Sequence, residues 1–208
     1  MEKLDYKKEY RDLYMPKKKP ALVDVPEMTF FMVDGKGEPG GSHYQQAMEL
    51  LYAFSFTIKM SKMGKDKPEG YFEYVVPPLE GLWWTKDGMF VLDTPREEWL
   101  WTSMIRQPEF VTEAVFEWAK KEISVKKPGL DVSRIRMESF TEGKCVQAMH
   151  VGSYAQEADT MEKMAAFMEE NGLKSDVGNK RRHHEIYLSD PRRTAPERLK
   201  TVLRTPVL

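Results

Sequence analysis

Glu185 and Tyr187 lie two residues apart in a β-rich run, residues 183–188. Side chains alternate between the two faces of a strand, so Glu185 and Tyr187 share one face with His183. The aliphatic side chains of this run share the opposite face, which most simply packs on a helix. A carboxylate enclosed by aromatic rings can take a proton from water as a general base, or attract a lipophilic cation. A carboxylate on an exposed edge strand would only be solvated, and the spacing alone leaves both readings open.

Two pairs of tryptophans lie in the first half of the chain. Trp99 and Trp101 are two residues apart and therefore share one strand face. A tryptophan ring can stack on a planar ligand or hold a cation by its quadrupole. Trp83 and Trp84 point to opposite faces of a strand, so at most one lines a pocket, and we include Trp84 as a candidate. Packing in the hydrophobic core is the alternative for all of them.

Two further residues are candidates for ligand contact. Tyr154 opens a helical stretch, from which its ring could reach a cleft beside the strand of Glu185 or could make a simple packing contact. Glu73 lies in a β-rich run, residues 71–76, at the place in the first half that corresponds to Glu185. A second pocket acid would suit a mechanism with two carboxyl groups, whereas an exposed strand position would make Glu73 a surface residue.

Other kinds of site lack their residues. The four histidines have no zinc-ligand spacing, and the single cysteine, Cys145, can build neither a metal cage nor an intramolecular disulfide. A glycine-rich phosphate loop followed by a helix is also missing. We therefore expect no metal ion and no cofactor.

The composition is that of a soluble globular protein. It is 41% hydrophobic and 31% charged, with a formal net charge of −1 over 208 residues. Because this charge creates no global attraction for nucleic acid or anionic lipid, we expect no direct nucleic-acid binding and no membrane association. The start of the chain lacks an apolar signal region, and we expect a cytoplasmic protein.

The pattern Gly-Ser-x-x-Gln occurs twice, at Gly41–Gln45 and Gly152–Gln156, each time between an apolar run and an amphipathic stretch. Serine at a helix cap with glutamine three residues later can satisfy the free amides of a helix start reciprocally. Two such boxes in matching context predict a duplicated strand–helix–strand–strand unit. A cleft between the two halves is a natural ligand site.

The periodicities and breakers predict an α+β fold with two pseudo-symmetric β-α-β-β repeats and mainly antiparallel sheets. We expect an N-terminal arm over the surface at residues 1–26, repeat one at about 27–106, a connecting helix at about 108–124 that starts at Pro108, and repeat two at about 134–208. Repeat two should begin with two strands separated by a turn at Glu142-Gly143.

Several stretches resemble the GyrI-like small-molecule-binding domain family, over roughly residues 20–208. They are His150–Tyr154, Glu185–Pro191, the terminal Thr201-x-x-Arg204-x-Pro206, Val33–Gly37, Pro78–Trp84 and Ile105–Pro108. The resemblance implies two pseudo-symmetric repeats around an aromatic pocket with an acidic residue at its base. It places that acid at Glu185, in the family's Glu-x-Tyr pattern.

The resemblance also implies a function. Regulators of the family sense bulky apolar cations through this pocket, and some stand-alone members resemble hydrolases that open the strained rings of DNA-alkylating cyclopropane compounds. We therefore expect this protein to bind hydrophobic or aromatic small molecules and to be a hydrolase, with Glu185 activating water and Tyr187 orienting that water or donating to a developing enolate-like oxygen. The alternatives are a non-catalytic module that sequesters or senses drugs, and a gyrase-binding inhibitor like the founding members.

Overall fold

The computed structural model describes residues 3–65, 67–90, 94–178 and 180–208. Six strands form one closed antiparallel barrel in the order β1-β3-β2-β5-β6-β4. The strands are β1 (Ala21–Lys36), β2 (Leu79–Trp84), β3 (Leu100–Arg106), β4 (Ile135–Val151), β5 (His183–Tyr187) and β6 (Lys200–Pro206). The longer helices are α3 (Ser42–Met60), α4 (Glu113–Lys126) and α5 (Glu157–Glu170), and shorter ones are α1 (Tyr6–Glu9), α2 (Arg11–Tyr14), η1 (Ser61–Met63), η2 (Arg96–Glu98), η3 (Val132–Arg134), η4 (Tyr154–Gln156) and η5 (Pro196–Arg198).

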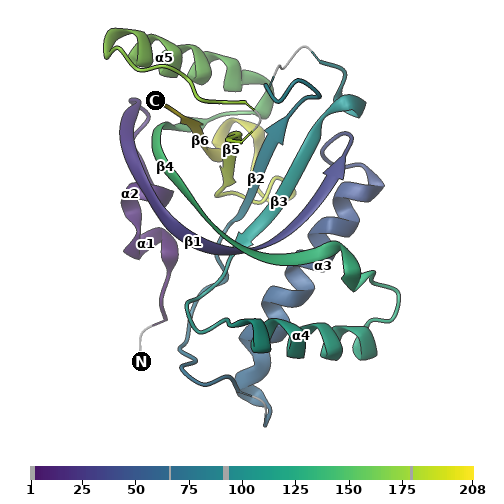
Figure 1. Ribbon diagram of the computed structural model, residues 1–208. Helices are drawn as coiled ribbons and strands as arrows, with labels where there is room; N and C mark the ends of the chain where they lie inside the picture. The colour runs from purple at the N-terminus through teal and green to yellow at the C-terminus, as the bar shows by residue number, and fades with distance from the viewer. Residues whose placement is uncertain (1–2, 66, 91–93, 179) are drawn as a thin grey trace.

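The predicted α+β fold with duplicated units is confirmed. The order β1-α3-β2-β3 is followed, after α4, by β4-α5-β5-β6. Exchanging the two units leaves the strand order of the barrel unchanged, because β1 and β4 pair with each other and β2 pairs with β5. Figure 1 shows β1 and β4 as long curved strands, with α3 and α5 on separate parts of the barrel wall.

Helix α3 packs on β1 and β3 through an apolar stripe at helical spacing. Ala47, Leu51, Phe54 and Ile58 are fully buried. Phe31 of β1 meets Phe54 edge to face, with ring centroids 5.7 Å apart. In the second unit Met164 of α5 packs in a smaller cluster over β4 and β6.

Only the second of the two helix caps forms as predicted. Ser153 and Gln156 make the reciprocal capping box, in which the Ser153 amide donates to the Gln156 side chain at 3.2 Å. At α3 the N-cap is Gly41, and the Gln45 side chain donates to the carbonyl of Gly40 at 2.7 Å. The glutamine therefore closes the preceding turn there and does not bond to the cap residue.

The expected arm over residues 1–26 is shorter than predicted and is not superficial. Strand β1 already begins at Ala21, and Tyr6, Leu13 and Tyr14 are buried. These three N-terminal residues pack against side chains that line the inside of the barrel. The low apolar content of this segment misled the prediction because its aromatic and backbone groups make buried polar contacts.

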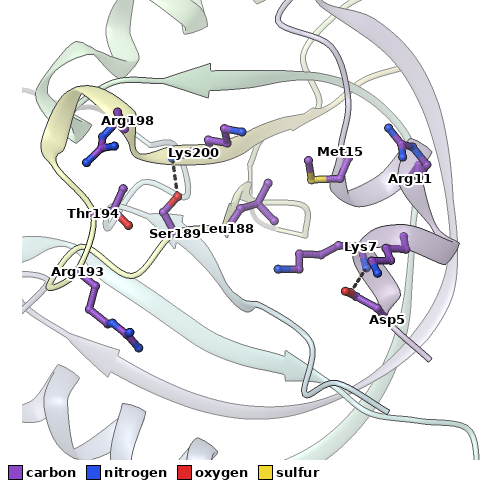
Figure 2. Close-up of a pocket in the computed structure, with 11 residues that line it drawn as sticks. Asp5, Lys7, Arg11, Met15, Leu188, Ser189, Arg193, Thr194, Arg198 and Lys200 are labelled. Carbon is purple, nitrogen blue, oxygen red and sulfur yellow. Dashed lines mark hydrogen bonds between the residues drawn. The ribbon is translucent and has the colours of Figure 1, made fainter. Parts of the chain in front are cut away.

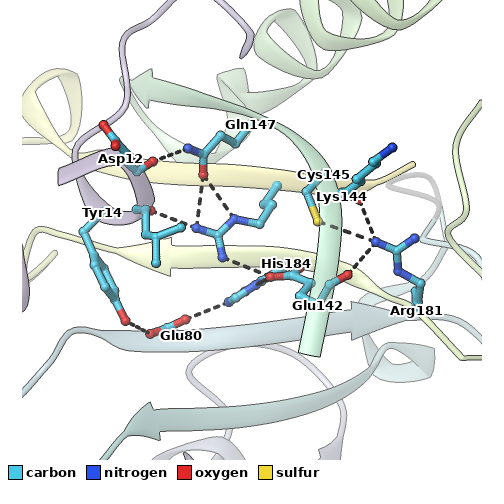
Figure 3. A network of polar contacts seen from close by, with 11 residues as sticks. Asp12, Tyr14, Glu80, Glu142, Lys144, Cys145, Gln147, Arg181 and His184 are labelled. Carbon is cyan, nitrogen blue, oxygen red and sulfur yellow. Dashed lines mark hydrogen bonds and ion pairs between the residues drawn. The ribbon is translucent and has the colours of Figure 1, made fainter. Parts of the chain in front are cut away.

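Those contacts belong to a charged network inside the barrel (Figure 3). His184 bonds to Glu80 at 2.9 Å and to Glu142 at 3.1 Å, and Arg204 donates to Glu142 at 3.0 Å. The N-terminal segment completes the network, because Tyr14 donates to Glu80 at 3.1 Å and Arg204 donates to the carbonyl of Leu13 at 2.8 Å. Pairing of this kind is what makes buried charge tolerable.

Three local expectations are wrong. Residues 71–76 form no strand; Tyr74 bridges to Leu4, and Tyr71, Phe72 and Phe110 pack around it. Helix α4 begins at Glu113, capped by Thr112, and not at Pro108. No turn divides β4 at Glu142-Gly143, because this part of β4 continues its pairing with β1.

Candidate functional site

Glu185 and Tyr187 lie together on the face of β5 that is opposite the charged network. The Tyr187 hydroxyl donates to Glu185 Oε2 at 2.7 Å. His183 Nε2, on the same face, lies 3.3 Å from Glu185 Oε1. Glu185 is 7% exposed, so its carboxyl group is held by two neighbours in a largely dry environment. The Tyr187 hydroxyl donates to this carboxyl group, and His183 does so in the tautomer that carries its proton on Nε2.

Trp83 on β2 fixes the direction of the Tyr187 hydrogen bond. Its Nε1 donates to the Tyr187 hydroxyl oxygen at 2.8 Å, so the hydroxyl proton is directed to Glu185. Gly81 lies between them, where an added Cβ would be 3.2 Å from the Tyr187 hydroxyl and 2.8 Å from Trp83 Nε1. Burial, followed by the charge of Glu185, raises the pKa of Tyr187 well above its ordinary value. Tyr187 therefore remains a protonated donor at physiological pH.

Aromatic rings from several elements surround this polar group. Tyr44 of α3 stacks on Trp83 with centroids 6.1 Å apart, and it meets Trp101 edge to face at 5.1 Å. Trp99 lies edge to face against Trp83 at 5.8 Å. On the other side Phe90 stacks on His183 at 4.9 Å. The indole groups of Trp99 and Trp101 donate to the backbone carbonyls of Thr94 and Gly37, which holds both rings in place.

Tyr154 is the exposed member of the aromatic group. Its ring meets Tyr187 edge to face with centroids 6.2 Å apart, and 42% of the residue is exposed. Burial, with smaller effects from Glu157 and Glu185, raises the pKa of Tyr154 to about 12. Tyr154 therefore forms the boundary between the buried acid and solvent.

Glu157, in the first turn of α5, is a second buried carboxyl group beside Glu185. It is 5% exposed. Burial and then the charge of Glu185 raise the pKa of Glu157 to about 9, although the nearby Thr201 hydroxyl opposes the shift. At neutral pH Glu157 is therefore a carboxylic acid on this face of the barrel.

Trp84 and Glu73 lie outside this group. Trp84 is on the opposite face of β2 from Trp83, and the Arg182 guanidinium lies 4.6 Å from its ring centroid. Glu73 is ion-paired with Lys62 at 2.7 Å in an irregular segment at the surface. The pairing with Lys62 lowers the pKa of Glu73, so it is a charged surface residue.

Sequence reasoning did not select Trp83, Tyr44, His183, Phe90 or Glu157 for this site. A signal existed for Glu157, because it shares helical spacing with Thr160 and Met164 on the buried stripe of α5. It was hidden because an acidic residue in the first turn of a helix is ordinary. Tyr44 and Phe90 come from distant segments, so no local pattern links them to Glu185.

Two cavities lie elsewhere. One, of about 700 Å³, opens between the N-terminal helices and the β5–β6 connection (Figure 2), and another, of about 520 Å³, lies between α3 and α4. Neither is lined by Glu185 or Tyr187.

Across the described residues, no group of three or more His, Cys, Asp or Glu side chains could hold a metal ion. No helix in the described part of the chain combines the length and apolar character needed to cross a bilayer.

The duplicated units, the closed barrel and the aromatic face around a buried acid define a small-molecule-binding domain. A family model described as the GyrI-like small molecule binding domain matches residues 18–208. The chain therefore belongs to the GyrI-like family. None of the curated proteins matches it.

Solved structures agree with this assignment. An uncharacterized conserved protein from Listeria innocua is 55% identical, with 99% of this chain and 100% of that chain covered and a TM-score of 0.95. A protein from the same organism described as a hydrolase is 53% identical, with the same coverage and a TM-score of 0.91. The C-terminal domain of EcmrR shares the fold at 11% identity, with a TM-score of 0.52 over 91% of this chain and 96% of that chain.

Proposed function

We propose that this protein is a hydrolase that adds water to the strained ring of a planar, apolar electrophile bound on the aromatic face. The substrate class is a cyclopropane-bearing alkylating agent. The observation that carries the proposal is the polar relay from Trp83 through Tyr187 to Glu185, which ends in a buried carboxylate surrounded by aromatic rings. The similarity to a Listeria innocua protein described as a hydrolase adds support.

Glu185 is the general base of this proposal. Its carboxylate takes a proton from a water molecule as the water oxygen attacks the ring carbon, which is a role suited to a positioned, partly desolvated carboxylate. Tyr187 positions Glu185 through the bond of 2.7 Å, and His183 holds the second oxygen. Because the Tyr187 proton points at Glu185, Tyr187 orients the base and does not protonate the substrate.

The aromatic side chains supply the binding energy. Trp83, Trp99 and Trp101 share one face of the sheet and are buried there by their neighbours. A flat ligand that enters among these rings gains dispersion and excludes water from the carboxylate. Tyr154, as the exposed ring at the boundary, is the side chain that moves to admit the ligand. Excluding water also strengthens the electrostatic effect of Glu185.

The experiment is a turnover assay. Purified protein at substoichiometric concentration is incubated with a spirocyclopropyl cyclohexadienone, and the ring-opened alcohol is quantified over time. Many product molecules per protein support a hydrolase. One product molecule or none per protein contradicts catalysis and leaves binding.

Sequestration of the electrophile is the second candidate, because the same aromatic face would enclose a reactive ring without chemistry. Its signature is saturable quenching of tryptophan fluorescence by aromatic ligands in a protein that shows no turnover. Replacing Trp101 by Ala should weaken that quenching. A flat titration across a panel of apolar ligands contradicts both candidates.

A further inference from the structure

Glu157 is a buried acid that the hydrolase proposal does not yet use. It projects from the first turn of α5 and shares the buried stripe of that helix with Thr160 and Met164. Its Oε1 atom is buried and has no hydrogen-bond partner among the described residues. Buried polar atoms are nearly always paired, so an unpaired carboxyl oxygen beside a proposed catalytic site calls for a functional explanation.

The carboxyl groups of Glu157 and Glu185 have different hydrogen-bond surroundings. Glu185 accepts a hydrogen bond from the Tyr187 hydroxyl at 2.7 Å, and His183 Nε2 lies 3.3 Å from its other oxygen. Burial and the charge of Glu185 oppose ionisation of Glu157, and only the Thr201 hydroxyl favours it. The other titratable groups near Glu157 are Tyr187 from β5, Tyr154 from η4 and His150 from β4. His150 pairs with Thr201 in the sheet and bonds to Thr160 of α5 at 2.9 Å. Two close carboxyl groups cannot both ionise cheaply, so Glu157, whose Oε1 has no donor, keeps its proton.

Ring opening needs a proton donor, and Tyr187 cannot fill this role. When the ring C–C bond breaks, its electron pair moves through the conjugated system to an oxygen atom of the substrate. Tyr187 already donates its proton to Glu185 and accepts from Trp83, so its hydroxyl has no second proton to give. A separate donor at this face would stabilise the developing oxyanion.

We propose that Glu157 is the general acid of this site and protonates the substrate oxygen as Glu185 removes a proton from the attacking water. This inference rests on the proposed hydrolase function. The water oxygen forms the new bond to the ring carbon, the ring C–C bond breaks, and its electron pair becomes the O–H bond made with the Glu157 proton. Glu185 then holds the proton from water, and exchange with solvent returns one proton to Glu157 and removes one from Glu185.

The test is the Glu157→Gln variant, which keeps the size of the side chain but cannot transfer a proton. With the spirocyclopropyl probe, kcat should fall about 100-fold or more, the range typical of a lost general acid. The affinity for the probe, measured by fluorescence quenching, should change less than about threefold. Glu162→Gln, at an exposed position on the same helix, is the matched control and should retain full activity.

The pH profile gives a second readout. Wild-type kcat should decline on the alkaline side as Glu157 loses its proton near the pKa of about 9. In Glu157→Gln the residual activity should lack that decline. If the variant keeps wild-type kcat, or if it keeps the alkaline decline, Glu157 is not the acid.

Infrared spectroscopy tests the protonation state without substrate. A protonated carboxyl band should be present at neutral pH in the wild type and absent in Glu157→Gln. If the band is absent from the wild type, the inference fails even when turnover is observed. If the wild type shows the band but no turnover, the hydrolase proposal fails and the buried acid remains as a property of the binding site.

A second inference comes from the 700 Å³ cavity beside the N-terminal helices (Figure 2). Six of its lining residues are cationic: Lys7, Lys8, Arg11, Arg193, Arg198 and Lys200. They come from the N-terminal helices, the β5–β6 connection and the start of β6. Among the described residues, no carboxylate lies within 4.0 Å of any of these six charges.

The one acid of this cavity does not neutralise it. Asp5 is the N-cap of α1, and its side chain accepts a hydrogen bond of 3.1 Å from the backbone amide of Lys7. Six positive charges around one concave surface repel one another. Because the formal net charge of the whole chain is only −1, this positive charge is concentrated locally at the cavity. The volume lies within the range of small-molecule sites, and the lining residues include no aromatic side chain on which a base would stack.

We infer that this cavity binds a small polyanion with two or more phosphate-type groups. Isothermal titration with tripolyphosphate should show saturable binding that weakens as salt rises. The double variant Arg193→Glu/Lys200→Glu should weaken it at least tenfold, whereas Lys121→Glu on exposed α4 should not. Absence of saturable binding at low salt, or equal binding by the double variant, contradicts the inference. Tighter binding of duplex DNA than of tripolyphosphate also contradicts it, because the occupant would then be an extended backbone.

Discussion

The indole Nε1 of Trp83 lies 2.8 Å from the hydroxyl oxygen of Tyr187, and this contact decides where the tyrosine proton goes. Because the oxygen accepts from Trp83, its own hydrogen is left for Glu185 at 2.7 Å. The proposed base, Glu185, is therefore oriented from a neighbouring strand, so that β2 contributes to the hydrogen bonding of the site on β5.

Trp83→Phe should preserve the ring packing but remove that orienting hydrogen bond. We expect kcat on the spirocyclopropyl probe to fall about tenfold, because Tyr187 then samples other hydroxyl directions. Stability should fall by about 1 kcal/mol, the usual net value of one hydrogen bond. Steady-state kinetics and urea unfolding measure the two effects, and an unchanged kcat would show that Tyr187 needs no fixed direction.

Glu185→Gln should abolish turnover, with kcat lowered by about 100-fold or more, because an amide cannot accept a proton from water. Binding of a neutral aromatic ligand should remain, since the rings that contact it are unchanged. Tryptophan fluorescence reports the binding and product analysis reports the turnover. An active Gln variant rules out Glu185 as the base.

Gly35→Ala should destabilise the fold. An added Cβ at Gly35 would lie 2.1 Å from the Trp101 ring, which is fully buried and cannot move aside without disturbing Tyr44. We expect a loss of about 1–3 kcal/mol, as for other overpacked sites. Gly129→Ala, with nothing within 4 Å of the added carbon, is the matched control and should change stability by less than about 0.5 kcal/mol. Equal urea midpoints for the two variants would contradict the close packing of Trp101.

The free energy of unfolding should be highest near pH 4.5. Burial opposes ionisation of Glu142, but His184 and Arg204 lower its pKa from 4.5 to about 2. The unfolded chain therefore binds the extra proton as the pH falls from 4.5 to 2, and stability is lost there. Burial opposes protonation of His184, but Glu142 and Glu80 raise its pKa from 6.5 to about 9, so that stability is lost as the pH rises from 6.5 to 9.

Glu157 adds to the alkaline loss, because its raised pKa means that the folded state holds a proton that the unfolded chain releases above pH 4.5. Urea unfolding at constant ionic strength across this range measures the profile. Glu157→Gln should lose less stability than wild type between pH 7 and 9. A wild-type profile that rises over that interval would contradict both assignments.

Much of the fold could be predicted from the sequence, because helices α3 and α5 and strands β2, β3, β5 and β6 have strong local periodicity. Alternation alone separated the two faces of β5, and the contacts of Glu185 and His184 lie on opposite sides as expected. The expectation that the aliphatic face packs on a helix is wrong, because this face carries His184 and lines the inside of the barrel. The aromatic run at 71–76 was misread because aromatic residues favour strands and loose aromatic clusters alike.

Closure of the barrel and the pairing of Glu157 with Glu185 could not be predicted from the sequence. Closure depends on β1 pairing along its length with β4, about a hundred residues away, and no local signal encodes that contact. Glu157 meets Glu185 only after α5 packs on β4 and β6. The partner of each carboxyl group is therefore a property of the three-dimensional arrangement.

The N-terminal segment has a consequence for how the protein can be handled. Removing residues 3–14 would take the Leu13 carbonyl from Arg204 and the Tyr14 hydroxyl from Glu80, leaving two buried ions short of a partner. Solvent would then reach charged side chains that are fully buried in the intact chain. A shortened protein is therefore not a minimal version of this domain but an opened one, and affinity tags belong at the other end of the polypeptide.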